Sequence, residues 1–483
     1  MTRGILKFFT LVFVTNPLRF LFFPALLLLV ACAHQNIPSS KPRNWNEVDT
    51  KPEHLNFPKT FIWGVAASAY QTEGGDSSSD WYVWERTLKE NGSSHVANSQ
   101  VCGNSAEHWN RFKEDIELAS QMRITSFRIS LSWSRIQPLG PDSFDETALR
   151  HYDTVLAEMK AHNIEPVICL HHFVIPQWFA NAGAWEKKEN IRFFVTFAKK
   201  AFARYNSKVK FWFPFNEPNV NSLAAYASDL YPPGHPNPEL AGTVMCNILD
   251  AHVAVYKALK NMQGGTEVQI GMMHNYSLLE PWNRHNLLDR VLVMYGNLLS
   301  NETVLRPFRT GKITLHIPGV ISMKYNNPEI THCYDFVGIN YYNRYGLHLN
   351  LSAKDRNKKV EMNRFPSDSA TDMDYGLYPE GLEVAIKEFA RLKKAIYITE
   401  IGIADDAGPK RALHILRSYY IISNAIKEGY DIRGVYYWSL TDNFEWTFGF
   451  DKRFGLYHID YKTQRRTLKP GAEELIKIIR ANK

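Results

Sequence analysis

Two glutamates, Glu217 and Glu400, stand where this sequence could carry acid–base chemistry. Each lies near the end of an apolar run typical of a buried strand, Lys210–Glu217 and Ala395–Gly402. Two carboxyl groups on either side of one bond are the usual means of hydrolysing a glycoside. Retaining enzymes hold these groups about 5–5.5 Å apart and inverting enzymes about 6.5–9.5 Å apart. The sequence does not determine this separation.

The neighbours expected for the two glutamates predict different roles. Arg128, in the run Ser126–Trp133, and Tyr342, at the end of Asp335–Tyr342, would both favour an ionised Glu400. An ionised carboxylate suits a nucleophile. Glu217 would face that negative charge in a partly dry cleft, so its pKa should be raised. We therefore expect Glu217 to be the general acid, and then the base.

Other polar and aromatic residues follow the same kind of apolar run, and we interpret them as partners for sugar hydroxyls or as platforms for sugar rings. They are Gln71, His172, Asn216, Asn340, Trp438, Glu445 and Trp446. Core packing is the alternative for the two tryptophans. The pair His171-His172 could suggest a metal, but no third ligand with fitting spacing is evident. We expect no metal and no bound cofactor.

Eight strand-like runs alternate with helical segments from residue 57 onward. The runs are Phe61–Ser68, Ser126–Trp133, Glu165–His172, Lys210–Glu217, Val268–Asn275, Asp335–Tyr342, Ala395–Gly402 and Ile432–Leu440. Helical segments include Ser105–Met122, Ala148–His162, Asn190–Arg204 and Lys410–Glu428. This pattern predicts the α/β class and a single (β/α)8 TIM barrel over residues 57–483, with extended βα loops. The active site of such a barrel lies at the C-terminal ends of its strands.

The N-terminus predicts export. Residues 1–31 are basic and then apolar, which is typical of a signal peptide, and Leu29-Val30-Ala31-Cys32 resembles a lipobox. We expect Cys32 to be lipidated, residues 32–56 to form a flexible tether, and the protein to be a bacterial membrane-anchored lipoprotein. A plain secretory signal and a signal anchor are the alternatives. The net charge of +7 includes no dense basic block, so no nucleic-acid partner is expected.

Motifs along residues 57–470 resemble those of the family 1 glycoside hydrolases, the β-glucosidase-like barrel enzymes. They are Phe61-Ile62-Trp63-Gly64 with Gln71-Thr72-Glu73-Gly74, Phe127-Arg128-Ile129-Ser130, Asn216-Glu217-Pro218, Gly338-Ile339-Asn340-Tyr341-Tyr342, Tyr397-Ile398-Thr399-Glu400, and Trp438-Ser439-Leu440 with Asn443-Phe444-Glu445-Trp446. The resemblance implies a retaining mechanism. It also implies that Gln71, His172, Asn216, Trp438, Glu445 and Trp446 line the subsite of the non-reducing sugar. Asn340 and Tyr342 would support Glu400 and the sugar, and Phe454 would close one wall.

These observations favour an exo-acting retaining β-glycosidase for a terminal β-glucosyl or related residue. The Glu445 carboxylate would repel a phosphate group, which favours an unphosphorylated sugar, although Lys452-Arg453 lie nearby. A non-catalytic, membrane-tethered sugar-binding protein and a transglycosidase are the alternatives. The oligomeric state stays open. Ile401 and Pro214 depart from the family pattern, and Pro214 suggests a local bulge in its strand.

Overall fold

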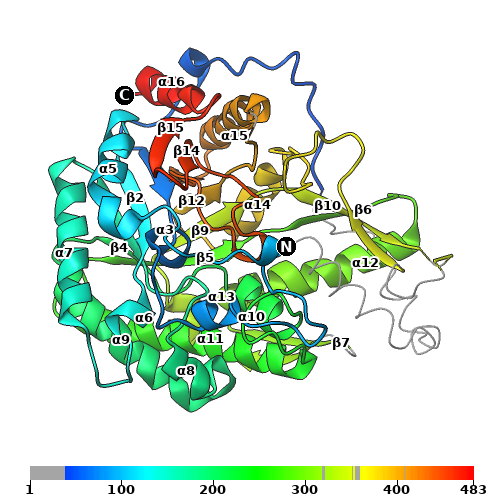
Figure 1. Cartoon of the computed structure of the whole chain (residues 1–483). Coiled ribbons are helices and arrows are strands. Elements are labelled where there is room, and N and C mark those ends of the chain that lie inside the picture. The colour runs from blue at the N-terminus through cyan, green and yellow to red at the C-terminus, as the bar shows by residue number, and fades with distance from the viewer. Residues whose placement is uncertain (1–38, 318–320, 351, 354–358, 407) are drawn as a thin grey trace.

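A closed barrel of eight parallel strands forms the centre of the molecule (Figure 1). The computed structural model describes residues 39–317, 321–350, 352–353, 359–406 and 408–483. The barrel strands are β1 (Ile62–Ala66), β2 (Ser126–Ser130), β3 (Glu165–Cys169), β4 (Phe211–Phe213), β5 (Gln269–Asn275), β9 (Phe336–Tyr341), β12 (Ile396–Ile401) and β13 (Ile432–Trp438). Each pairs with the next barrel strand along the chain, and β13 closes on β1. The predicted TIM barrel and its eight strands are confirmed.

Helices surround the strands as an outer ring (Figure 1). The main ones are α5 (His108–Gln121), α7 (Glu146–Ala161), α9 (Ile191–Tyr205), α11 (Pro238–Lys260), α13 (Thr303–Thr310), α14 (Gly381–Ala390), α15 (Pro409–Lys427) and α16 (Glu473–Ala481). Their sequences explain this placement. In α9 the buried residues Phe194, Phe197, Ala198, Ala201 and Phe202 recur every three or four positions, which puts them on the face that packs inward.

Strand β4 is the shortest in the barrel because of Pro214. The strand ends at Phe213, whose carbonyl accepts a hydrogen bond from the Leu170 N–H at 2.8 Å. Proline has no N–H to continue the ladder. The bulge that we expected at Pro214 is therefore replaced by the end of the strand.

Long connections at the C-terminal ends of the strands carry further elements. They contain the helices α3 (Ala69–Glu73), α4 (Asp80–Trp84), α6 (Trp133–Ile136), α8 (Gln177–Asn181), α10 (Pro218–Tyr226) and α12 (Leu287–Asn297). A small sheet joins β6 (Leu278–Pro281), β10 (Arg344–Leu349) and β11 (Val360–Asn363). Two strand pairs lie outside the barrel and the small sheet. They are β7 (Lys312–Ile317) with β8 (Ile321–Asn326) and β14 (Tyr457–Asp460) with β15 (Arg465–Leu468). The expected extended βα loops are present.

The segment that precedes the barrel lies against its outer helices. The Ser40 and Tyr378 hydroxyls are 2.7 Å apart, the Trp45 indole donates to Glu380 at 2.8 Å, and the Asn56 N–H donates to Ser423 in α15 at 3.0 Å. Figure 1 shows this stretch in dark blue, running to α16. We expected a flexible tether over 32–56, but residues 39–56 are held in place by these contacts. The predicted signal peptide, residues 1–31, and Cys32 lie outside the described residues.

The described cysteines are all free thiols, namely Cys102, Cys169, Cys246 and Cys333. Among the described residues, no helix combines the length and apolar character needed to span a bilayer.

Candidate active site

Glu217 occupies the junction between β4 and α10. Its backbone is left-handed, with φ of 43°, and Pro218 forms the first residue of the helix. Proline disfavours a right-handed helical conformation in the residue before it, so the helix cannot extend back through Glu217. The Asn216 N–H donates to the His171 carbonyl at 2.8 Å, which fixes the turn. Glu217 is buried, with 3% of the residue exposed.

Glu400 lies near the end of β12, where the strand pairing is irregular. The register of β12 against β9 shifts between Ile398 and Glu400, and its register against β13 shifts between Ile398 and Ile401. Such irregularities commonly turn a side chain toward an active site. Ile401, the departure noted in the sequence, is buried directly after Glu400 and pairs with Tyr341 and Tyr437. It is a strand residue with a buried side chain.

Two donors hold the Glu400 carboxylate. Arg128 forms an ion pair with one oxygen, and the Tyr342 hydroxyl donates to the other. Arg128 is fully buried, and its guanidinium also donates to the side-chain amide oxygen of Asn216 at 3.4 Å. Burial, and then the negative charge of Glu400, raise the pKa of Tyr342 well above its ordinary value, so the phenol keeps its proton. The Glu400 carboxylate therefore has a cation on one oxygen and a hydroxyl donor on the other.

Glu217 lies in a different environment. The side chains of Asn340 and Asn275 donate to the same oxygen of Glu217, at 2.6 and 3.0 Å. Burial, followed by the charge of Glu400, raises the pKa of Glu217 to about 8, although both amide donors act in the opposite direction. At neutral pH, Glu217 therefore holds a proton, whereas Glu400 is bound by the Arg128 cation and the Tyr342 hydroxyl.

Both glutamates line one cavity, which we call the catalytic cavity; its volume is about 560 Å³ when the solvent at its mouth is included. Of the residues predicted from sequence, it is lined by His172, Asn216, Glu217, Tyr342, Glu400, Trp438, Glu445, Trp446 and Phe454. Gln71, Asn340 and Arg128 are buried behind this lining and bind to Glu445, Glu217 and Glu400, respectively. The structure thus gathers every predicted site residue of the barrel around a single space.

Glu445 and Trp446 form one part of the cavity wall. The Gln71 amide donates to Glu445 at 3.3 Å, and Trp446 packs on Trp81 with ring centroids 4.7 Å apart. The His172 ring stacks on Trp438 at 5.7 Å. Burial and the charge of Glu400 raise the pKa of Glu445 to about 8. The wall therefore presents a protonated carboxyl, an imidazole and two indoles, a combination suited to the hydroxyls and faces of one sugar.

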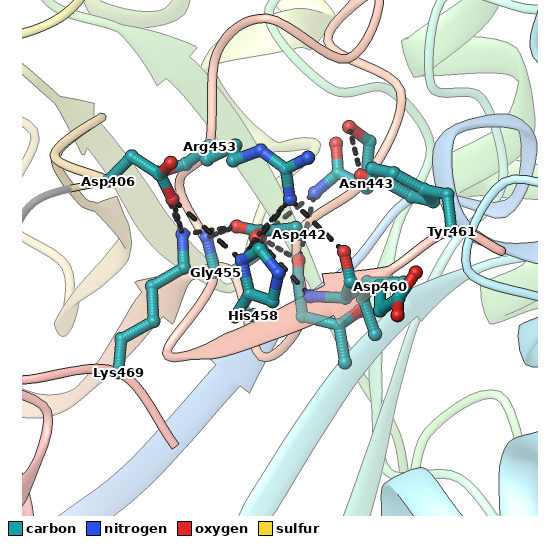
Figure 2. A network of polar contacts seen from close by, with 12 residues as sticks. Asp406, Asp442, Asn443, Arg453, Gly455, His458, Asp460, Tyr461 and Lys469 are labelled. Carbon is teal, nitrogen blue, oxygen red and sulfur yellow. Dashed lines mark hydrogen bonds and ion pairs between the residues drawn. The ribbon is translucent and has the colours of Figure 1, made fainter. Parts of the chain in front are cut away.

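An ion-pair network fixes the loop that carries Glu445 and Trp446 (Figure 2). The buried Asp442 carboxylate accepts from Lys469 at 2.6 Å, from Arg453 at 3.2 Å and from the Gly455 N–H at 3.0 Å. Arg453 also donates to the Ile459 carbonyl at 3.1 Å. The ligand atoms of Asp406, Asp442 and His458 lie within 4.8 Å of one another. The two cations already neutralise this cluster, so we describe it as an ion-pair network.

Neither cation that follows this loop reaches the catalytic cavity. Lys452 donates to the Asp372 carbonyl at 2.6 Å, and Arg453 belongs to the Asp442 network. Among the described residues, no lysine or arginine lines the cavity. Because Glu445 is protonated at neutral pH, the repulsion that we expected between its carboxylate and a phosphate is weakened.

His171 does not join His172 in the cavity. Its ring packs against Trp185 and Phe215, at 5.4 and 5.1 Å. Burial lowers its pKa to about 3. The two adjacent histidines therefore face different surroundings, which does not suggest a shared metal.

Several residues of the cavity wall were not predicted from the sequence. They are Phe173, Tyr231, Asn275, Met373, Tyr375, Thr447 and Phe448. Asn275 is the last residue of the predicted strand Val268–Asn275, the one run whose end we left unassigned, so its position alone could have indicated it. Tyr231, Met373 and Tyr375 lie in long loops, where no periodic pattern shows which side chains turn inward.

Comparison with known proteins places this geometry in a family. The model of glycosyl hydrolase family 1 matches residues 53–483. The chain belongs to this family. It is thus a glycoside hydrolase, and its (β/α)8 barrel is the fold of its solved relatives. It is 28% identical to the 1,4-beta-D-glucan glucohydrolase of Thermotoga neapolitana, over 88% of this chain and 98% of that protein.

Two other relatives of this family 1 enzyme bear on its substrate. It is 29% identical to a 6-phospho-beta-galactosidase of Clostridium acetobutylicum, over 86% of this chain and 95% of that protein. The solved structure of a family 1 β-glucosidase from Thermotoga maritima in complex with isofagomine lactam matches with a TM-score of 0.79 and 25% identity, over 89% of this chain and 99% of that one. Relatives at similar identity thus include enzymes named for phosphorylated and for unphosphorylated sugars.

Proposed function

We propose that this family 1 enzyme is a retaining exo-β-glycosidase that hydrolyses the terminal non-reducing β-D-glucosyl, or a closely related, residue of O-glycosides. The observation that carries the proposal is the unequal state of two buried carboxyl groups in one cavity. Glu400 is paired as an anion by Arg128 and Tyr342, whereas the raised pKa of Glu217 keeps it protonated. A double displacement requires one ionised carboxylate as the nucleophile and one protonated carboxyl group as the acid.

In the first step, a Glu400 oxygen attacks the anomeric carbon and forms an ester. The bond from that carbon to the leaving oxygen breaks, and Glu217 donates its proton to the leaving oxygen. Glu400 loses its charge in the ester, so one cause of the raised pKa of Glu217 disappears.

In the second step, Glu217 acts as the base. It removes a proton from water, whose oxygen attacks the anomeric carbon, and the ester bond to Glu400 breaks. The sugar leaves with its original anomeric configuration, and Glu400 returns as a carboxylate. Attack by a sugar hydroxyl in place of water would give transglycosylation through the same ester. Both carboxyl groups are present and share the cavity, which disfavours a role in binding alone.

The cavity wall around Glu445 supports exo action on an unphosphorylated sugar. We expect Glu445 and Trp446, with Gln71 behind them, to lie past the bound residue and to block extension of a chain there. No described lining residue is a cation that could balance a phosphate.

The test uses an aryl β-glucoside and its 2-deoxy-2-fluoro analogue. We expect the wild type to cleave the first with retention, seen by NMR of the fresh product, and Glu400→Gln to be inactive. The analogue should label Glu400, as mass spectrometry of peptides would show. A label on another residue, or an inverted product, would overturn the mechanism.

We also propose that the protein is exported and held at a membrane by a lipid on Cys32. The support is the sequence Leu29-Val30-Ala31-Cys32 after an apolar run. Because Ser40 already contacts Tyr378, the eight residue steps from Cys32 to Ser40 would span at most about 28 Å. The Cys32→Ser variant should lose the lipid mass and leave the membrane fraction. An unchanged mass and distribution would exclude the anchor.

A further inference from the structure

A second and larger cavity opens beside the catalytic one. It measures about 850 Å³ to its open mouth, and we call it the side cavity. Asn275, Tyr342 and Tyr375 line both cavities. Asn275 donates to Glu217 and Tyr342 donates to Glu400. The two cavities therefore meet where the glycosidic bond would lie between the two carboxyl groups.

The walls of the side cavity are mainly apolar. They include Val220 and Leu223 of α10, and Leu230 after that helix. Leu279 of β6, Leu299 after α12, and Met362 of β11 also contribute. In the catalytic cavity, by contrast, three glutamates and a histidine line the wall. None of the described residues that line the side cavity is an Asp, Glu, His, Lys or Arg.

The amide side chains in this wall are already hydrogen-bonded within the protein. The Asn219 amide donates to the carbonyls of Asn275 and Ser300, at 3.3 and 2.9 Å, and its oxygen lies 3.1 Å from the His274 ring. The Asn343 amide donates to the Tyr345 hydroxyl at 3.0 Å. These amides therefore have few donors or acceptors left to bind a ligand.

Two hydroxyls in the wall are used in the same way. Ser228 donates to the Ala224 carbonyl at 2.9 Å, and Ser300 donates to the Gly296 carbonyl at 2.8 Å. A sugar in the side cavity would exchange water for a wall with few free donors or acceptors, which is unfavourable. An alkyl or aryl group would instead gain from leaving water.

We propose that the side cavity binds the leaving group of the substrate and selects an apolar aglycone, an alkyl or aryl group attached directly to the glycosidic oxygen. This inference rests on the proposed function, because Glu217 must protonate that oxygen at the junction of the two cavities. The sugar would occupy the catalytic cavity and the aglycone would extend past Asn275 and Tyr342. The enzyme would then act on apolar β-glucosides in preference to oligosaccharides.

The experiment compares unactivated substrates with the same sugar, namely methyl, butyl and octyl β-D-glucoside, with cellobiose. The alkyl series has leaving groups of similar acidity, so differences in kcat/KM report binding of the chain. Full transfer of a methylene from water corresponds to a rise of at most about fourfold. We expect kcat/KM to rise with chain length toward this limit until the cavity is filled, and octyl glucoside to exceed cellobiose.

Two variants test the cavity itself. Ala224→Leu fills part of the space, and Leu223→Asn makes its wall polar; Leu288→Asn, on α12 and 39% exposed, is the matched control outside it. We expect the octyl-to-methyl ratio of kcat/KM to fall at least about fivefold in the first two variants and to stay unchanged in the control. The ratio does not depend on the fraction of folded enzyme, so a folding defect cannot imitate the result.

The outcomes separate the two proposals. If no glucoside is cleaved, the proposed function fails. If methyl glucoside and cellobiose are cleaved but octyl glucoside is no better, the apolar aglycone is refuted while the proposed function stands. An octyl-to-methyl ratio that stays high in both Ala224→Leu and Leu223→Asn would also overturn the assignment of the side cavity.

Discussion

Arg128 and Glu400 form a buried ion pair that joins β2 to β12, with the two residues 272 positions apart in the chain. The arginine side chain is fully buried, and the glutamate side chain is 5% exposed. A charge in such a place requires a partner, since its transfer from water is costly. The barrel therefore supplies the cation that keeps the proposed nucleophile ionised.

Removal of Arg128 alone should be strongly destabilising. Arg128→Met leaves Glu400 without its cation, and we expect the free energy of unfolding in urea to fall by about 3–5 kcal/mol. Glu400→Gln with Arg128→Met removes both charges, so it should recover part of this loss. A single variant as stable as the wild type would show that the pair does not hold the barrel together.

The pH dependence of the rate should follow Glu217. Its pKa of about 8 means that the acid form, which must donate the proton, predominates below that pH. We expect kcat/KM for an aryl β-glucoside to fall about tenfold per unit above pH 8. Glu217→Gln should be slower by about 10²–10⁴-fold and should lack this limb. An alkaline limb that begins near pH 5 would contradict the assignment.

Asn275 should tune that limb. Its amide stabilises the ionised form of Glu217, so Asn275→Ala should raise the pKa of Glu217 and move the alkaline limb upward by up to about one unit. Asn219→Ala is the matched control, because that amide binds backbone carbonyls and His274 instead of Glu217. A limb that shifts equally in both variants would mean that the bond from Asn275 is not the cause.

The sequence was sufficient for the barrel and for the chemistry at its rim. Strand periodicity places residues at strand ends, and parallel strands bring those ends together, so Glu217 and Glu400 could be paired before their contacts were known. The end of β4 was predicted less well. The effect of Pro214 depends on whether the neighbouring strand needs the N–H that proline lacks. The strand ends there, without the bulge that we expected.

The loops were less predictable for a different reason. Tyr231 and Tyr375 reach the cavity from stretches with no repeating pattern, and their direction depends on contacts with distant elements. Residues 39–56, which lie against the outer helices, resembled a linker because they are polar and include proline. Its few specific contacts, such as Trp45 with Glu380, are visible only when α14 is in place.

The Asp442 network should be important for stability. Lys469 is almost fully buried, and burial lowers its pKa although Asp442 opposes this. Asp442→Asn would leave that ammonium without its main partner, so we expect a loss of about 3–5 kcal/mol in the free energy of unfolding. Asp406→Asn, at a carboxylate that is 55% exposed, should cost less than about 1 kcal/mol. Equal losses in thermal unfolding would contradict this ranking.

Specificity against phosphorylated sugars should depend on the missing cation. Glu445→Ser removes the carboxyl from the cavity wall, and we expect kcat/KM for an aryl β-glucoside to fall about 10–100-fold with no gain on the 6-phosphoglucoside. Lys452 and Arg453 cannot help, because each is bound elsewhere. Thr447 lines the cavity, so Glu445→Ser combined with Thr447→Lys supplies a charge there. This double variant should gain activity on the 6-phosphoglucoside, and efficient cleavage of that substrate by the wild type would refute the argument.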